Sequence, residues 1–488
     1  MSFLNQCLRS LLLAVPLGGM TTVMANSIKG PSSSEEPYLI RAQPGVVTVS
    51  LLTVGDAVNY KADGVTPYRM VGIPDGLGAF DNGDGTFTVL MNHEIPGNGI
   101  VRDHGFRGAF VSKWIIDKDT LTVLHGEDLI KHAFKWDSAS SSYVPITGGF
   151  SRFCSADLPP LSAFYNAATG NGYAGRIFMN GEENGSEGRA FGHVLDGNSY
   201  ELPRLGKFSW ENSVTHPDSG DKTVVVGLDD STPGQVYVYV GTKQTSGGPI
   251  DQAGLNNGTL YGIKVTGVTN ENVNTGIPSG TAFTGFDLGD VSSKSGSFLD
   301  RHSGTNRMTT FNRPEDGCWD PVNLNDFYFV TTASFTGKSR LWRLHFNNPA
   351  DPAAGGTIDM LLDGTEGHHM LDNITVTKRG EVIAQEDVGN NIHIGKVWQY
   401  IIATGEFEIV AQHDPDLFLA LNPLQPNFLT QDEESSGVIP MDDILGEGWY
   451  LLDVQAHYGT DAELVEGGQL NLLHIPPGWS NRSNRKNR

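Results

Sequence analysis

A short apolar strand that ends in adjacent acidic or amide residues recurs along most of this chain, and this repeat limits the folds open to it. Six copies can be read in the sequence. They are FTVLMNHE ending at Glu94, RIFMNGEE ending at Glu183, TVVVGLDD ending at Asp230, FYFVTTAS near Ser334, EVIAQED ending at Asp387 and GWYLLDVQ around Asp453. A unit that recurs across the whole length predicts a closed array of similar sheets.

Several copies have a second carboxylate in a short strand roughly 15 to 19 residues upstream. These carboxylates are Glu211 in FSWEN, Glu315 in NRPEDGCWD, Asp372 in MLDNITV and Glu434 in QDEESSG. A hairpin signal such as TKRG separates the two strands, and a further strand such as QVYVYVG often follows. Each unit thus has the strand order of a propeller blade, and the sequence predicts an all-β propeller of about six blades.

The composition agrees with many short strands. Among 488 residues there are 60 Gly and 25 Pro, a density of turn-forming residues that disfavours long helices. A hydrophobic fraction of 38% with only 18% charged residues is sufficient for a large core, so most of the chain is not disordered. No Pro- or Ser-rich linker divides residues 26–479, which we expect to form a single domain.

The two ends of the chain differ from the part between them. Residues 1–25 have one cation, an apolar run and small residues before Asn26, which is typical of a secretory signal peptide cleaved after Ala25. A membrane anchor is the alternative, but Pro16 interrupts the apolar run. Residues 480–488 form a basic tail that we expect to be disordered. The protein is therefore predicted to be exported, to the periplasm or the extracellular space, with no membrane association after cleavage.

The acidic charge bears on both partners and cofactors. The formal net charge is −23, which argues against nucleic acid as a partner. The innermost strands of a propeller line its central channel, so one acidic residue per blade would bring several carboxylates together. Such carboxylates repel one another unless cations neutralise them, and their oxygen atoms suit Ca²⁺ or Mg²⁺. The alternative is that the acidic pairs are solvated strand ends or turn residues.

The cysteines allow two interpretations. Removal of Cys7 with the signal peptide leaves Cys154 and Cys318. In an exported protein these two residues could form a disulfide. Alternatively, Cys154 could be a thiolate ligand in the acidic centre. No G-x-S-x-G or C-x-x-C motif is present, so serine-nucleophile and zinc-ribbon chemistry have little support.

Several short motifs, in order and from about residue 71 to residue 457, resemble the PhoX-type alkaline phosphatases. The motifs are NHE at 92–94, NGEENG at 180–185, LPRLGKFSWE at 202–211 followed by LDD at 228–230, NRPED at 312–316, LDNITV with AQED, and ESSG at 434–437. The resemblance implies a secreted, monomeric bacterial phosphatase with a six-bladed propeller and a buried calcium-iron centre. It also implies hydrolysis of small phosphomonoesters.

The resemblance assigns roles to particular residues. Cys154 would be the thiolate that bridges two ferric ions, Glu211 the ligand in an inner strand, and Arg313 with Glu315 the Arg-x-Glu motif. Further candidate metal ligands are Glu183, Asp372, Glu386, Asp387 and Glu434. The planar guanidinium of Arg313 suits a bidentate contact with phosphate oxygens. The alternative for Arg313 is that it only pairs with carboxylates of the ring.

Two other functions remain open for a propeller with an acidic centre. One is a calcium-dependent phytase or a lactonase-like hydrolase, which would use one or two Ca²⁺ ions and no thiolate. The other is a non-catalytic propeller in which Ca²⁺ is structural and the loops bind a partner.

Overall fold

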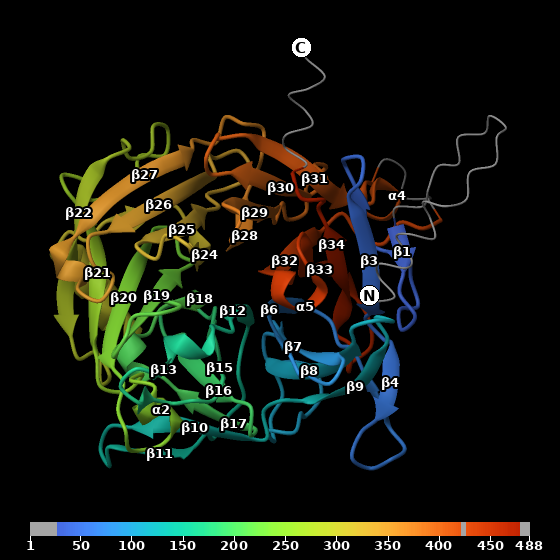
Figure 1. Ribbon diagram of the computed structural model, residues 1–488, viewed down its shortest axis with the longest axis horizontal. Coiled ribbons are helices and arrows are strands. Elements are labelled where there is room, and N and C mark those ends of the chain that lie inside the picture. Colours follow the sequence, from blue (N-terminus) through green and yellow to red (C-terminus); the bar gives the residue numbers. More distant parts are fainter. Residues whose placement is uncertain (1–26, 421–425, 479–488) are drawn as a thin grey trace.

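The computed structural model describes residues 27–420 and 426–478. The predicted signal peptide and the basic tail lie outside the described residues. Six blades of mostly antiparallel strands surround a central axis, and the outermost strands of the third and fourth blades pair to join these two blades into one sheet (Figure 1). Their innermost strands are β6 (Pro74–Asp81), β12 (Phe153–Asp157), β18 (Trp210–Thr215), β24 (Pro314–Trp319), β28 (Leu371–Val376) and β32 (Glu433–Pro440). Each contacts the next and β32 returns to β6, so the ring is closed and the predicted β-propeller is confirmed.

The first three blades follow one another along the chain. Blade 1 adds β7 (Thr86–His93), β8 (Phe110–Asp117) and β9 (Val123–Asp128) to β6. Blade 2 adds β15 (Ile177–Glu182), β16 (Ala190–Val194), β17 (Asn198–Glu201), β10 (His132–Asp137) and β11 (Ser142–Pro145) to β12. Blade 3 adds β19 (Lys222–Asp229), β20 (Gly234–Thr242), β21 (Thr259–Val265) and β22 (Thr281–Gly289) to β18.

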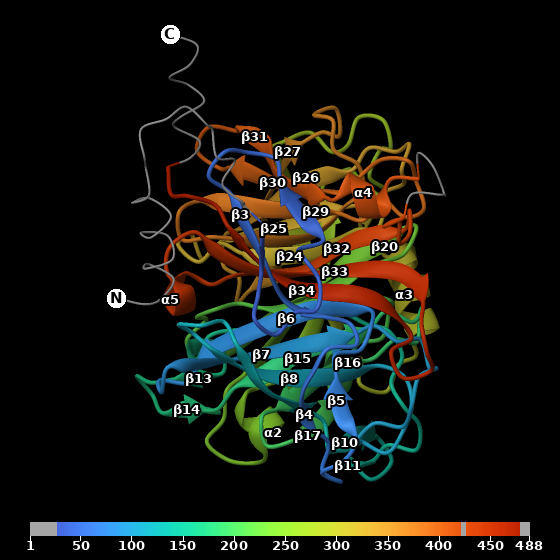
Figure 2. The ribbon, with the colours of Figure 1, turned by 90° about the vertical axis from the view of Figure 1, so that its right-hand side faces the viewer.

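The last two blades take their outermost strands from the N-terminal part of the chain. Blade 4 adds β25 (Asp326–Thr331), β26 (Arg340–Phe346) and β27 (Gly356–Leu362) to β24. Blade 5 adds β29 (Glu381–Glu386), β30 (Lys396–Ile401), β31 (Phe407–His413) and β2 (Leu39–Arg41) to β28. Blade 6 adds β33 (Trp449–Gly459), β34 (Glu466–His474), β3 (Val47–Thr53) and β1 (Ser27–Lys29) to β32 (Figure 2). This pairing ties the two ends of the described chain together.

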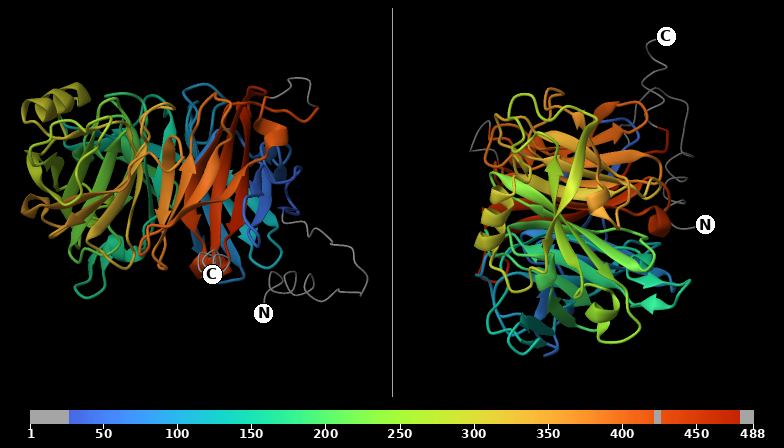
Figure 3. Two further views of the ribbon diagram at one scale, coloured as in Figure 1. Left: turned by 90° about the horizontal axis from the view of Figure 1, so that it is seen from above. Right: turned by 90° about the vertical axis from the view of Figure 1, so that its left-hand side faces the viewer.

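The strands run between the two faces of a flat ring (Figure 3). The remaining short strands are β4 (Ala57–Tyr60), β5 (Pro67–Arg69), β13 (Tyr165–Asn166), β14 (Asn171–Gly172) and β23 (Thr310–Phe311). The helices are α2 (Pro249–Gln252), α3 (Gly296–Thr305), α4 (Pro415–Phe418) and α5 (Asp442–Leu445), with 3-10 turns at Leu161–Ala163, Pro203–Leu205 and Pro352–Ala354. Within the described part of the chain, no helix has the length and apolarity needed to cross a membrane.

The hydrophobic core lies between neighbouring blades. Between blades 3 and 4, for example, Val226 and Val238 belong to the same buried cluster as Phe329 and Trp342. All four side chains are fully buried. Removal of this apolar surface from water holds the sheets together and fixes the inner strands that surround the axis.

Candidate metal centre

One backbone hydrogen bond recurs at the same place in every blade. The carbonyl of the residue before the inner strand accepts a hydrogen bond from the N–H of a residue at the end of the second strand. The pairs, carbonyl first, are Ile73 with Glu94, Arg152 with Glu183, Ser209 with Asp230, Arg313 with Thr332, Met370 with Asp387 and Asp432 with His457. The six N···O distances lie between 2.9 and 3.0 Å. This bond defines equivalent positions in the six blades.

The residue two positions after each of these carbonyls carries a carboxylate or a thiol. We call this set the inner ring, and it comprises Asp75, Cys154, Glu211, Glu315, Asp372 and Glu434. The set at the end of the second strands, the outer ring, comprises Glu94, Glu183, Asp230, Thr332, Asp387 and His457. Five of the six inner-ring residues are almost completely buried. All six blades thus contribute a potential metal ligand to the axis.

A local irregularity of the strands explains this placement. In four blades the register shift in the pairing of the inner strand spans the inner-ring residue, and in blade 1 it directly follows Asp75. In blade 6 the shift occurs two residues later, between Ser436 and Val438. A β-bulge interrupts the alternation of side chains between the faces of a sheet and redirects them. The bulges therefore turn the inner-ring side chains away from the blade interfaces and toward the axis.

The residue after the inner-ring position ties the inner strands together. Asn373 donates from Nδ2 to Ser155 Oγ at 2.6 Å, and Ser155 Oγ donates to Glu211 Oε1 at 2.6 Å. Asn212 Nδ2 donates to Asp316 Oδ1, also at 2.6 Å. The same residues, except Glu211, line a cavity of about 740 Å³ that continues the channel beyond the inner ring. These bonds across the axis hold the inner ring in a fixed geometry.

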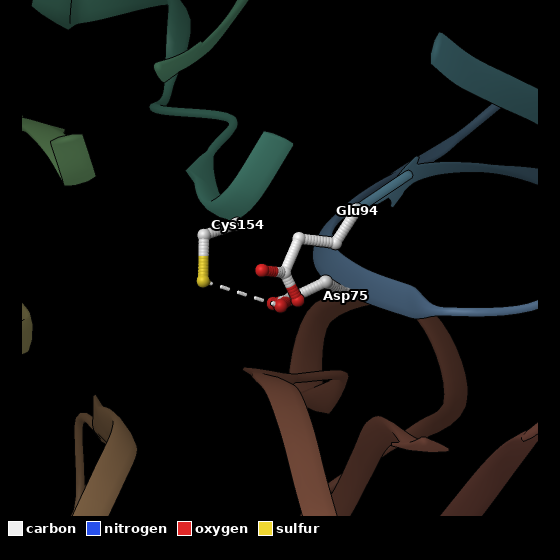
Figure 4. A group of neighbouring side chains, drawn as sticks. All are labelled: Asp75, Glu94 and Cys154. Carbon is white, nitrogen blue, oxygen red and sulfur yellow. Dashed lines mark hydrogen bonds between the residues drawn. The ribbon is translucent and has the colours of Figure 1, made fainter. Parts of the chain in front are cut away.

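The ligand atoms of the two rings lie close enough together to share metal ions. Three groups have all their ligand atoms within 4.8 Å of one another, namely Asp75 with Glu94 and Cys154, Cys154 with Glu183 and Glu211, and Glu211 with Glu315 and Asp372. Figure 4 shows the first group, in which Cys154 Sγ lies 3.4 Å from Asp75 Oδ2. Cys154 and Glu211 each belong to two groups, so the three groups form one continuous cluster.

The pKa values of the cluster show that its acidic groups are poorly stabilised in their charged forms. Burial is the largest cause that raises the pKa of four groups well above their ordinary values, and these are Asp75, Cys154, Glu315 and Asp372. Burial, with the charge of Glu94, raises the pKa of Glu183 to about 10. Burial raises that of Glu211 to about 7. Bound cations would relieve this repulsion, and a set of carboxylates with one thiol fits multivalent cations.

Two arginines reach this cluster. Nε and Nη2 of Arg313 donate to the two oxygens of Asp230 at 2.8 and 3.0 Å. The same Nη2 lies 2.7 Å from Glu315 Oε1. Nη2 of Arg152 lies 2.6 Å from Glu94 Oε1 and also contacts Glu183 Oε2. Each guanidinium thus links carboxylates at the edge of the cluster.

The structure brings most of the predicted ligands to the axis. Cys154, Glu183, Glu211, Glu315 and Asp372 belong to the three groups, and Asp387 and Glu434 lie in the rings beside them. Cys154 and Cys318 are both unpaired, and they lie in the inner strands of blades 2 and 4.

Glu386 does not reach the cluster. Its carboxylate accepts hydrogen bonds from Trp398 Nε1 at 3.0 Å and from the backbone N–H of His369 at 2.9 Å, inside blade 5. Adjacent residues of a strand point to opposite faces of the sheet, so only one member of the Glu386–Asp387 pair can face the axis. The structure places Asp387 there.

Three residues of the cluster were not predicted as site residues. Asp75 lies 19 residues before Glu94, the same spacing as between Glu211 and Asp230, so the signal was present in the sequence. Glu94 was identified only as a strand end. No sequence pattern marks Arg152, because its contacts with Glu94 and Glu183 arise only when the blade has folded.

Two of the six repeat positions read from the sequence are corrected by the structure. In blade 4 the outer-ring position is Thr332 and not Ser334. In blade 6 it is His457 and not Asp453. His457 Nε2 lies 3.7 Å from Glu434 Oε2, and its Nδ1 lies 2.7 Å from Glu466 Oε2. Against the effect of burial, these two carboxylates raise the pKa of His457 to about 11, so blade 6 places a basic group in the outer ring.

Without bound cations, the protein is expected to lose stability as the pH rises from about 5 to about 8. An unfolded glutamate has a pKa of about 4.3, whereas burial raises the pKa of Glu211 to about 7 and that of Glu183 to about 10. The folded state therefore holds more protons than the unfolded state in this window, and the free energy of unfolding falls as the pH rises. Thermal unfolding of chelator-treated protein checks this prediction. A midpoint that rises with pH would contradict it.

The comparisons with known proteins concern the fold. No protein-family model matches the sequence, and no curated protein matches it. The fold is similar to that of PhoX from Pseudomonas fluorescens, solved in complex with vanadate, a transition state analogue. The TM-score is 0.63 and the sequence identity 11%, over 88% of this chain and 95% of that chain. At this identity the comparison establishes a shared propeller fold.

A second solved structure is more distant. The sialidase from Trypanosoma rangeli, in complex with 2,3-difluorosialic acid, has a TM-score of 0.36 and 10% identity, over 88% of this chain and 59% of that chain. A likeness at this level carries no argument about function.

Proposed function

We propose that this protein is an exported, metal-dependent phosphatase that hydrolyses small phosphomonoesters in the channel, at the inner and outer rings. The observation that carries the proposal is the continuous cluster of buried carboxylates and one thiol, with arginines at its edge. Support comes from the fold shared with PhoX, which was solved with vanadate. Vanadate, like phosphate, is an oxyanion, and cations and guanidinium groups are suitable partners for such an anion.

The cluster offers two kinds of ligand. Carboxylate oxygens suit Ca²⁺, and the thiol of Cys154, which lies between two of the groups, suits iron. We therefore propose calcium and iron as the metals. Bound cations would neutralise the charge of the phosphate oxygens and lower the pKa of a bound water. The inner ring would hold these ions, with Glu94 and Glu183 of the outer ring as additional ligands.

Arg313 has the geometry of a phosphate-binding residue. Asp230 accepts two of its hydrogen bonds and so fixes the plane of the guanidinium. The side chain is 26% exposed, although Glu315 beside it is buried. Arg313 can therefore present its remaining N–H groups to an anion above the cluster, where it would stabilise the charge of the transferred phosphoryl group.

The test of the function is hydrolysis of p-nitrophenyl phosphate by the metal-loaded protein. We expect turnover that a chelator abolishes. Turnover of a lactone but of no phosphomonoester would contradict the proposal, and so would metal binding without any hydrolysis.

Arg313→Gln is expected to lower kcat/KM for this substrate by about 100-fold or more, since it removes a charged donor from the transition state. Arg343→Gln is the matched control, because Arg343 pairs with Asp359 in the outer part of blade 4. The control should retain full activity. If both variants keep the wild-type kcat/KM, Arg313 only pairs with ring carboxylates.

Export is the remaining part of the proposal. The first 25 residues carry the pattern of a cleaved signal peptide, and export would place the enzyme in the periplasm or outside the cell as a monomer. Fractionation of cells that produce the full chain, with N-terminal sequencing of the product, tests this. A product in the cytoplasm that still begins at Met1 would contradict it.

A further inference from the structure

We propose that Arg152 is a second phosphate-binding residue, which acts together with Arg313 to select phosphomonoesters over phosphodiesters. This inference rests on the proposed function and extends it to the class of substrate. It follows from the position, contacts and exposure of Arg152.

Arg152 and Arg313 occupy equivalent positions in blades 2 and 4. In each case the carbonyl makes the backbone hydrogen bond that recurs in all six blades, with Glu183 N and with Thr332 N. Both residues have positive φ angles, 48° and 59°. Each stands two residues before an inner-ring ligand, Cys154 and Glu315 respectively. At the other four positions the residues are Ile73, Ser209, Met370 and Asp432, so only these two blades present a cation from this position.

The contacts of Arg152 place its guanidinium at the cluster. It links Glu94 and Glu183, which belong to two different groups of potential metal ligands. Those two groups have Cys154 in common. The guanidinium therefore joins two neighbouring groups of ligands at the edge of the cluster.

The exposure of Arg152 shows that it also faces solvent. Its side chain is 44% exposed, whereas Glu94 and Glu183 are 8% and 13% exposed. Cations bound to these two carboxylates would neutralise their negative charge. The five N–H donors of the guanidinium would then be free for an anion that approaches from solvent.

The neighbouring Arg189 does not have this geometry. Its Nε and Nη2 donate to the two oxygens of Glu182, both at 2.7 Å. Glu182 belongs to none of the three groups, and it also accepts a hydrogen bond from Ser151 N. Arg313 also pairs with a carboxylate in this way, but it contacts Glu315 of the cluster as well, and Arg152 contacts two members of the cluster. The contacts described for Arg189 are with Glu182, so Arg189 forms a structural pair.

Arg152 and Arg313 are linked through the cluster, because Arg152 contacts Glu183, Glu183 and Glu315 each share a group with Glu211, and Glu315 contacts Arg313. Two guanidinium groups placed in this way would suit a phosphate with several free oxygens. A monoester leaves three terminal oxygens, so two arginines can bind while cations contact the same group. A diester has only two such oxygens and a second organic group, which would meet one of the arginines. The arrangement thus favours the monoester.

The test measures binding of inorganic phosphate to the metal-loaded full-length protein by calorimetry. We expect Arg152→Gln to weaken phosphate binding by about tenfold or more, since it removes charge-assisted hydrogen bonds to the anion. Arg152→Lys keeps the charge without the planar fork and should show a smaller loss. Arg343→Gln should bind phosphate like the wild type. Metal content is measured for every variant.

Steady-state kinetics provide a second test of the role of Arg152. For p-nitrophenyl phosphate, Arg152→Gln is expected to raise KM about tenfold with a smaller change in kcat, and the preference for the monoester over bis(p-nitrophenyl) phosphate should fall. Phosphate affinity and KM like those of the wild type, in a variant that keeps its metal, would overturn the inference. If Arg152→Gln loses metal, Arg152→Lys provides the test instead. A phosphate affinity of Arg152→Lys equal to that of the wild type would then overturn the inference. If the wild type binds phosphate through Arg152 but hydrolyses nothing, the proposed function fails and the binding site stands.

Discussion

Glu211→Gln is expected to reduce kcat/KM for p-nitrophenyl phosphate by about 100-fold or more and to lower the bound metal per chain. Glu211 belongs to two of the three ligand groups, so one substitution weakens both. The amide is similar in shape and can still accept the hydrogen bond from Ser155, which limits the change to the charge. Elemental analysis and steady-state kinetics of the same preparation measure the two effects.

Glu386→Gln is the matched control for this prediction. Glu386 is also a buried glutamate in a central part of the propeller, but it accepts hydrogen bonds inside blade 5. Its substitution is expected to lower the thermal midpoint and leave the metal content unchanged. Loss of metal in Glu386→Gln, with normal metal in Glu211→Gln, would contradict the arrangement of the cluster.

Removal of metal is expected to lower the midpoint of thermal unfolding by about 5 °C or more near pH 8. An ion present at about 1,000 times its Kd adds about 4 kcal/mol to the free energy of unfolding, and the cluster has room for more than one. Unfilled, its buried carboxylates repel one another at this pH. Calorimetry before and after treatment with a chelator, and again after calcium is restored, measures the shift. Equal midpoints in all three states would contradict a metal-stabilised ring.

The blade repeat could be predicted from the sequence because its signal is local. Apolar strands that end in acidic residues occur in four of the six copies, and the 19-residue spacing from Glu211 to Asp230 reflects one hairpin. The strand order of the blades and the convergence of carboxylates on the axis follow from that pattern. The closure of blades 5 and 6 could not be predicted in this way, since β2 and β3 come from the distant N-terminal part of the chain.

The exact ligand set depends on features that sequence patterns do not carry. The bulge in each inner strand decides which of two adjacent residues faces the axis, and a change of register exchanges the faces. At the end of the second strand of blade 5, Glu386 and Asp387 point to opposite faces, and the sequence alone could not show which of the two faces the axis. The segment around Asp75 gives only a weak strand signal, because PDGLGAF contains two glycines and lacks the apolar pattern of a strand.

The measurement that tests the account most directly is the elemental composition of the purified mature protein, wild type and Cys154→Ala together. We predict more than one metal ion per chain in the wild type, with calcium and iron both present. In the variant, iron should be lost and calcium retained, since only iron requires the thiolate. A folded wild-type protein that holds no calcium or iron, even after incubation with both, would contradict the proposal that this ring of carboxylates is a metal centre.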